Sequence, residues 1–261
     1  MDSINELSLN EIQKYLNNKI AADSILVFDK IDSTNNEAKR RILNNKLEKT
    51  IIIANSQSAG RGRRGRSFYS PKDTGVYISF ILKSESIKFD VGMITTLTCV
   101  AVSKAISKVS GIIPKIKWVN DLYIRNKKVC GILCEAVNDT NTGNLKAVVV
   151  GIGINCNTVF EDELAEIAGA IFDDDKYIRN QLIAELINEI DIIIADDVTD
   201  KYLEYSRENS MIIGREIFIV GEEDNIYIAD NIGTKGELVL TDKNGQVRII
   251  NSGEVSIRIN N

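Results

Sequence analysis

The spacing of apolar residues changes once along this chain, and that change limits the folds that the sequence can adopt. Before about residue 212, two long stretches have apolar side chains at helical spacing, with short apolar runs typical of buried strands around them. After Gly214, short alternating segments are separated by turn residues, and Asn244-Gly245 is a strong hairpin signal. The pattern predicts an α+β protein with two domains, a mixed β-sheet with flanking helices over residues 1–211 and a small β-barrel over residues 212–261.

The same spacing predicts the individual elements. We expect helices over 94–109 and 178–190, and a third beginning near Ser33, where Thr34 and Glu37 have capping-box spacing. Strands are expected in the large domain at 25–28, 51–54, 76–82, 116–118, 122–124, 128–136 and 147–154, and in the small domain at 216–220, 226–229, 237–240, 247–250 and 255–259.

The sequence contains no histidine, and this absence excludes several classes of active site. Ser-His-Asp and Cys-His arrangements and imidazole metal ligands cannot form. The four cysteines lie in apolar segments without C-x-x-C spacing, which favours small buried thiols over disulfides or a metal site. A net charge of −5 disfavours nucleic-acid binding by long-range attraction. The chemistry must therefore use lysine, arginine, carboxylates or groups of the ligand.

The amino-terminal residues 1–6 have neither a basic leader nor an apolar segment, and no run of 18 apolar residues occurs in the sequence. We therefore expect a cytoplasmic protein.

The segment Gly60–Arg66 contains four arginines alternating with three glycines. Glycine allows the backbone to approach a ligand closely, and the forked donors of arginine suit carboxylate and phosphate oxygens. On its own, the segment fits a nucleotide site and an RNA-binding tract about equally well.

A short hairpin is expected to bring Lys117 and Lys128 to one place, because they lie on a strand and its return strand. The two ammonium groups can neutralise a triphosphate. Asn120 can bind a nucleotide through its amide, and Asp121 can bind Mg²⁺ or accept a proton. Each signal is weak alone, since such lysines are also ordinary surface charge and Asn-Asp is also a turn sequence.

Together these segments, in this order, resemble the biotin protein ligase family. The likeness runs from about Ile25 to the carboxyl terminus, although Val119 replaces a usual proline and Phe68 stands where the family often has tryptophan. It rests on Ser33-Thr34-Asn35, Gln57, Gly60–Arg66, the K-W-x-N-D segment Lys117–Asp121, Lys128–Ile132 and Gly151–Asn155.

The resemblance implies a class II synthetase-like catalytic domain followed by an SH3-like barrel. It also implies ATP-dependent activation of biotin to biotinyl-5'-AMP and transfer of the biotinyl group to a lysine of a biotin carboxyl carrier protein. ATP and Mg²⁺ would serve as co-substrate and activator, with no tightly bound metal. The expected partner is the carrier domain of a biotin-dependent carboxylase or decarboxylase, without DNA or membrane. The resemblance leaves open whether two copies of the protein form a homodimer.

Only about 24 residues precede the likeness, so we expect a monofunctional ligase without the amino-terminal DNA-binding domain of some family members.

Carried over residue by residue, the resemblance implies three sets of site residues. Arg63, Lys128 and Asp121 are expected to act in catalysis, with Asp121 also holding Mg²⁺. Biotin is expected to contact Ser33, Thr34, Asn35, Gln57, Gly60, Arg61, Gly62, Arg63, Lys128, Gly131, Ile132 and Gly153. ATP is expected to contact Arg63, Arg64, Arg66, Phe68, Lys117, Asn120, Asp121, Lys128 and Asn155.

The chemistry of this activity fits a chain without histidine. The carboxylate of biotin is already ionised at neutral pH, so its activation needs orientation and charge neutralisation rather than a general base. The Gly/Arg loop is expected to close over the adenylate and exclude water. Two alternatives remain: a lipoate protein ligase of the same superfamily, and an RNA-binding protein that uses the Gly/Arg loop.

Overall fold

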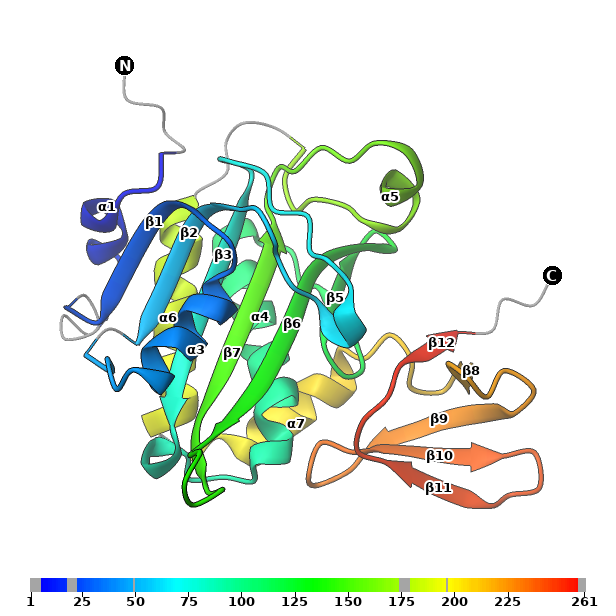
Figure 1. Cartoon of the computed structure of the whole chain (residues 1–261). Helices are drawn as coiled ribbons and strands as arrows, with labels where there is room; N and C mark the ends of the chain where they lie inside the picture. Colours follow the sequence, from blue (N-terminus) through cyan, green and yellow to red (C-terminus); the bar gives the residue numbers. More distant parts are fainter. Residues whose placement is uncertain (1–5, 18–22, 49, 174–178, 196, 258–261) are drawn as a thin grey trace.

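The fold comes from a computed structural model, which describes residues 6–17, 23–48, 50–173, 179–195 and 197–257 (Figure 1). The helices are α1 (Leu9–Gln13), α3 (Thr34–Leu43), α4 (Ile94–Ser110), α5 (Asp162–Ile167), α6 (Arg179–Ala195) and α7 (Thr199–Glu208). Three short 3-10 turns are η1 (Arg63–Gly65), η2 (Ser84–Ser86) and η3 (Val91–Met93).

A seven-stranded mixed sheet forms the centre of the molecule, in the order β1-β2-β3-β7-β6-β5-β4. Its strands are β1 (Ile25–Ile31), β2 (Ile51–Gln57), β3 (Gly75–Lys83), β4 (Lys115–Lys117), β5 (Asp121–Ile124), β6 (Lys127–Asn138) and β7 (Leu145–Asn155). β1 and β2 are parallel, and the other described pairs in this sheet are antiparallel. β3 is buried along almost its whole length, which requires cover on both faces.

Helices supply that cover. Figure 1 shows α3 in front of the sheet and α4 and α6 behind it. Successive residues of a strand point to opposite faces, so Ile53 of β2 joins the core on the α4 and α6 side, whereas Ile52 packs with Ala38 and Ile42 of α3. Burying one such side chain contributes about 1.5–3 kcal/mol, so both faces stabilise the sheet.

The carboxyl-terminal residues form a second, five-stranded antiparallel sheet in the order β11-β10-β9-β8-β12. Its strands are β8 (Glu216–Ile219), β9 (Ile226–Ile232), β10 (Leu238–Asp242), β11 (Val247–Ile250) and β12 (Val255–Ile257). Gly245, in the predicted hairpin turn, has φ of 78°, a conformation that glycine adopts without strain. The inner residues of this sheet, such as Ile217 and Leu238, belong to the same core as α4 and α6.

This arrangement confirms the predicted α+β class and the five carboxyl-terminal strands, although the predicted residues 258 and 259 of the last strand lie outside the described residues. The predicted capping box between Thr34 and Glu37 is wrong. Ser33 is the residue before α3 and its side chain makes no capping hydrogen bond. The backbone N of Thr34 donates to Gln57 Oε1 at 2.9 Å, and the Glu37 carboxylate accepts a hydrogen bond from Arg40 Nε at 2.9 Å. The sequence analysis also did not predict α5 or α7.

In the part of the chain that the structure describes, no helix has both the length and the apolar character needed to cross a membrane.

Candidate functional site

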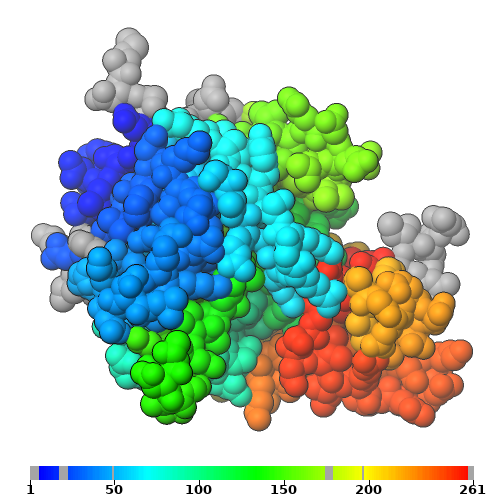
Figure 2. Space-filling view, viewed as in Figure 1, coloured from blue at the N-terminus to red at the C-terminus, as the bar shows by residue number. Residues whose placement is uncertain are grey.

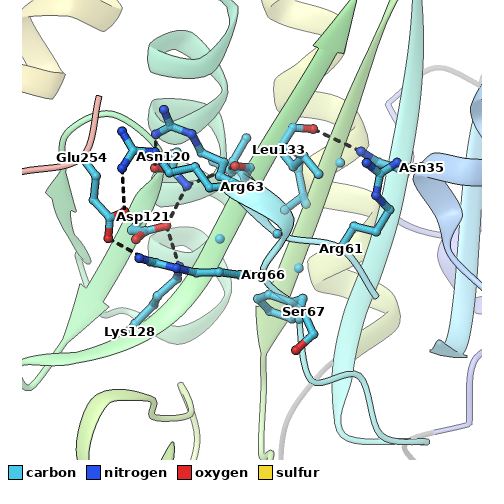
Figure 3. A pocket seen from close by; sticks show the side chains of 18 of the residues that line it. Asn35, Arg61, Arg63, Arg66, Ser67, Asn120, Asp121, Lys128, Leu133 and Glu254 are labelled. Atoms are coloured by element: carbon cyan, nitrogen blue, oxygen red, sulfur yellow. Dashed lines mark hydrogen bonds and ion pairs between the residues drawn. The ribbon is translucent and has the colours of Figure 1, made fainter. Parts of the chain in front are cut away.

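A cavity lies between the Gly/Arg loop, the strands β6 and β7 and the start of α3, and Figure 3 shows it at close range. The space-filling view places the cyan segment with this loop next to the orange and red carboxyl-terminal residues (Figure 2). Most of the site residues expected from the sequence line this cavity. They are Ser33, Thr34, Asn35, Gln57, Arg61, Gly62, Arg63, Arg64, Arg66, Phe68, Lys117, Asn120, Asp121, Lys128, Gly131, Ile132 and Gly153.

Two expected residues are not among those that line it. Gly60 lies at the base of the loop, where a Cβ atom would come within 2.4 Å of the Phe68 carbonyl oxygen. Asn155, the last residue of β7, is buried, and its amide nitrogen donates to the carbonyl oxygens of Lys128 at 3.3 Å and Gly169 at 3.1 Å. In this structure Asn155 therefore supports the backbone that carries Lys128.

The Gly/Arg loop is folded like a small hairpin. Phe68 N donates to Gly60 O at 2.9 Å, and Gly62 N donates to Arg66 O at 2.7 Å. At its tip, Arg64 and Gly65 have φ of 55° and 75°, which allows the chain to reverse. The loop thereby holds several guanidinium groups over one wall of the cavity.

One corner of the cavity joins the loop to the β5–β6 hairpin. Arg63 Nη1 donates to Asn120 Oδ1 at 2.8 Å, and Asn120 Nδ2 donates to Asp121 Oδ1 at 2.9 Å. The same Asp121 oxygen lies 2.7 Å from Lys128 Nζ. Figure 3 shows these four side chains converging, so Arg63 and Lys128, both expected to act in catalysis, line the same cavity.

Lys117 adds a second lysine at this end. Burial lowers the pKa of its ammonium group, which lies 5.8 Å from the centre of the Tyr123 ring. Burial also raises the pKa of the Tyr123 hydroxyl to about 12, so this ring stays neutral at physiological pH. A desolvated ammonium gains more from an anionic ligand than a solvated one, so Lys117 favours an anion here.

The carboxyl-terminal sheet contributes a carboxylate, Glu254, that the sequence analysis did not predict. Arg66 Nη1 donates to Glu254 Oε1 at 2.8 Å, and Arg64 lies 3.8 Å from its other oxygen. Burial opposes ionisation of Glu254, but the hydrogen bond from Arg66 and the neighbouring positive charges hold its pKa below the usual value. Arg66 is 188 residues away in sequence, so no local motif signals this pair.

Neutral polar side chains line the opposite end of the cavity. Gln57 Oε1 accepts hydrogen bonds from the backbone N of Thr34 at 2.9 Å and from its hydroxyl at 3.2 Å. Gln57 Nε2 donates to Ser70 Oγ at 2.9 Å, and the Ser79 hydroxyl lies 2.8 Å from Thr34 Oγ1. These bonds fix the side chains that face the cavity and suit a neutral ligand with its own donors and acceptors.

Glycines in β6 and β7 leave room for side chains that cross the sheet. A Cβ at Gly153 would lie 2.5 Å from Phe68 Cε1, and a Cβ at Gly151 would lie 2.0 Å from Asn35 Oδ1. Phe68 packs edge-on against Tyr77 with ring centres 6.4 Å apart. The remaining lining residues, which were not among the expected site residues, are Ser67, Trp118, Leu133, Gly151, Ile152 and Val255.

Among residues whose placement is described, no group of three or more His, Cys, Asp or Glu side chains is arranged to hold a metal ion. Asp121 and Glu254 are the acidic residues that line the cavity. Mg²⁺ often needs just one or two protein carboxylates, because phosphate oxygens and water complete its coordination. Asp121, at the cationic corner, fits that smaller requirement.

Comparison with known proteins places this geometry in a family. Residues 27–155 match the model of the Biotin/lipoate A/B protein ligase family. The bifunctional ligase/repressor BirA of Bacillus subtilis (strain 168) is 36% identical over 169 residues, covering 64% of this chain and 51% of the relative. The biotin--[acetyl-CoA-carboxylase] ligase of Mycobacterium tuberculosis is 25% identical over 223 residues, covering 80% and 79%.

Among solved structures, the biotin protein ligase from Aquifex aeolicus in complex with biotin and ATP has a TM-score of 0.69 and 24% identity. The match covers 90% of this chain and 98% of that one, and it shows a common fold. The chain spans about half the length of the Bacillus relative that it matches. The matched residues 27–155 include the Gly/Arg loop and both cavity lysines, and the chain therefore carries a domain of the Biotin/lipoate A/B protein ligase family.

Proposed function

We propose that this protein is an ATP-dependent ligase that forms biotinyl-5'-AMP and transfers the biotinyl group to a lysine of a biotin carboxyl carrier protein. One observation carries the proposal: a single cavity has Arg63, Lys117 and Lys128 at one end and the neutral hydrogen-bonding pair Thr34 and Gln57 at the other. Cations suit the place where a carboxylate meets a phosphate, and neutral donors and acceptors suit the ring of biotin.

In the first step, a carboxylate oxygen of biotin bonds to the α-phosphorus of ATP while the bond from that phosphorus to the pyrophosphate oxygen breaks. Negative charge accumulates on the phosphate oxygens, so Lys128 and Arg63 stabilise the transition state by neutralising it. Mg²⁺ would be held by Asp121 and would supply further neutralisation of the triphosphate. No proton transfer is needed, which suits a chain without histidine.

In the second step, the neutral amine of the acceptor lysine attacks the acyl carbon of the adenylate, and AMP leaves as the acyl–oxygen bond breaks. The attacking nitrogen then loses a proton. Asp121, at the corner with Lys128, is our candidate to accept it.

The Gly/Arg loop protects the intermediate. Its arginines contact both sides of the site, with Arg63 bonded to Asn120 and Arg66 bonded to Glu254. A closed loop excludes water from an acyl-adenylate that would otherwise hydrolyse. We further propose that the protein acts in the cytoplasm, on the carrier domain of a biotin-dependent carboxylase or decarboxylase.

An exchange assay tests the choice of acid. Purified protein, ATP, Mg²⁺ and labelled pyrophosphate are incubated with biotin or with lipoate, and incorporation of label into ATP is measured. We expect biotin-dependent exchange, followed by covalent labelling of an added carrier domain. Exchange with lipoate alone would identify a lipoate ligase, and RNA binding that weakens steeply with salt and needs no ATP would support the RNA-binding alternative.

A further inference from the structure

Glu135 of β6 lies next to the cavity without being one of its lining residues, and its carboxylate joins three other side chains. Its Oε1 lies 2.6 Å from Lys39 Nζ of α3 and 3.2 Å from Arg61 Nη2 of the Gly/Arg loop. Its Oε2 accepts a hydrogen bond from Asn35 Nδ2 at 2.9 Å. Two of these partners, Asn35 and Arg61, line the cavity.

The carboxylate is ionised in this setting. The Glu135 side chain is 17% exposed, and its burial opposes ionisation. The hydrogen bonds from Lys39 and Asn35, with the charges of Lys39 and Arg61, outweigh burial and lower the pKa below its usual value. Hydrogen bonds to a charged acceptor are shorter and stronger than neutral ones, so Glu135 restricts its partners more than an amide at this position would.

Asn35 is fixed from both ends of its amide. Its oxygen lies 2.6 Å from the Ser79 hydroxyl, and its nitrogen is held by Glu135 and by the carbonyl oxygen of Leu133 at 3.3 Å. The side chain passes directly over Gly151, where a Cβ atom would lie 2.0 Å from Asn35 Oδ1. Figure 3 shows Asn35 directed to Leu133 beside Arg61.

Arg61, near the start of the Gly/Arg loop, is held by two contacts. Its Nη1 donates to Asn36 Oδ1 at 3.0 Å, and its other terminal nitrogen faces Glu135. Arg63 and Arg66, farther along the loop, have separate partners in Asn120 and Glu254. Glu135 therefore acts on the side of the cavity that includes α3, away from the Asp121 and Lys128 corner.

We propose that Glu135 is a positioning residue for the acid substrate, acting through Asn35 and Arg61, and that it contributes little to the binding of ATP. This inference rests on the proposed function, because it assigns the α3 side of the cavity to biotin. Loss of the charge leaves Asn35 and Arg61 able to rotate away from the cavity, so the Michaelis constant for biotin rises while the constant for ATP and the maximal exchange rate change little.

The test is the exchange assay with the full chain carrying Glu135→Gln, a substitution that preserves shape and removes charge. We expect the KM for biotin to rise about tenfold, the effect of losing one hydrogen bond to a charged group, with the KM for ATP within twofold of the parent. Glu48→Gln is the matched control, since it removes the charge of a carboxylate that pairs with Arg41 without lining the cavity. Its KM for biotin should stay near that of the parent.

Thermal unfolding of each variant separates positioning from a general loss of structure, because destabilisation alone does not change one KM selectively. If Glu135→Gln does not fold, Glu135→Asp is measured instead, and it should give a smaller but equally selective rise. An unchanged KM for biotin, or equal changes for biotin and ATP, would overturn the role of Glu135 while leaving the ligase intact. A parent protein without biotin-dependent exchange would refute both proposals.

Discussion

At the scale of single residues, the shape of the cavity depends on glycines, which have no side chain, as much as on the side chains that line it. Gly153 and Gly131 lie in register on neighbouring strands, and Phe68 approaches both. A motif search can find glycines of this kind, but it cannot say which side chain occupies the space above them. Phe68 follows the Gly/Arg loop in sequence and was assigned to ATP, whereas its packing over Gly153 became visible in the fold.

Gly153→Ala should displace Phe68. The added methyl would lie 2.5 Å from Phe68 Cε1, so the ring or the strand must move. Overpacking of this kind costs about 1–3 kcal/mol, and we expect a lower melting temperature with a raised KM for biotin or ATP. Gly131→Ala is the control, because its nearest contacts are 3.3–3.4 Å away. Equal effects at the two glycines would contradict this account of the packing.

Lys128→Ala should abolish most biotin-dependent pyrophosphate exchange. Removal of a preorganised cation costs about 3 kcal/mol, which is roughly a hundredfold in rate. Lys127→Ala is the control, because Lys127 Nζ donates to the carbonyl oxygen of Ala165 at 2.8 Å and does not line the cavity. Near-normal exchange in Lys128→Ala would show that its role has been misassigned.

At the scale of elements, long periodic segments were predictable and short ones were not. α4 extends over 94–110, close to the expected 94–109, because apolar residues recur along its whole length. α7 buries just Tyr202, Leu203 and Ser206, a pattern too sparse to distinguish a helix from a loop. The start of α3 was predicted, but the hydrogen bonds of Thr34 with Gln57 and of Asn35 with Glu135 come from strands that are distant in sequence.

The start of α3 gives a prediction about pH. Asp32 forms hydrogen bonds with Arg40 at 2.8 and 3.0 Å and with Asn36 at 2.9 Å, and the contact with Arg40 holds its pKa well below the usual value. A carboxylate with a lowered folded-state pKa stabilises the protein above its unfolded pKa of 3.8, and this contribution is lost as pH falls further. Because the pair is partly exposed, we expect less than about 1 kcal/mol.

Thermal unfolding of the parent and of Asp32→Asn between pH 3 and pH 7 measures this effect. The parent should be more stable than the variant near neutrality, and the difference should begin to shrink below about pH 4. A difference in stability that is constant over the whole pH range would mean that the contact with Arg40 does not lower the pKa of Asp32.

The Gly/Arg loop gives a prediction about leakage. Arg63→Gly removes the hydrogen bond from the loop to Asn120, and the loop then opens more often. We expect free biotinyl-5'-AMP to appear in solution at a several-fold higher rate, as measured by chromatography of the reaction mixture without acceptor. Equal retention of the adenylate by parent and variant would remove the idea that the loop acts as a lid.

At the scale of the whole molecule, the two sheets share one core and one cavity. The presence of two separate sheets was predictable, because strand patterns and turn residues are local features of the sequence. Their contact was not, because Glu254 meets Arg66 and Trp118 Nε1 donates to Gly236 O at 2.9 Å, pairs that are distant in sequence. The division at residues 211 and 212 stays a prediction about domains, although the buried Ile212 packs in the common core.

Glu254→Gln should weaken the contact between the carboxyl-terminal sheet and the Gly/Arg loop. We expect a raised KM for ATP and faster loss of the adenylate, with little change in melting temperature, because Arg66 loses a charged partner at the cavity. Glu222→Gln is the control, since it breaks a comparable pair with Arg248 in the same sheet, away from the cavity. Identical behaviour of the two variants would mean that the Arg66–Glu254 contact is ordinary surface charge.

Trp118 is the single tryptophan of the sequence, and it lines the cavity while its indole nitrogen bonds to the carboxyl-terminal sheet. The tryptophan fluorescence of the protein therefore comes from one indole at the junction of the two sheets. Its emission maximum and quenching will report ligand entry and separation of the sheets without an attached dye, so a stopped-flow trace on the unmodified chain can follow both events in real time.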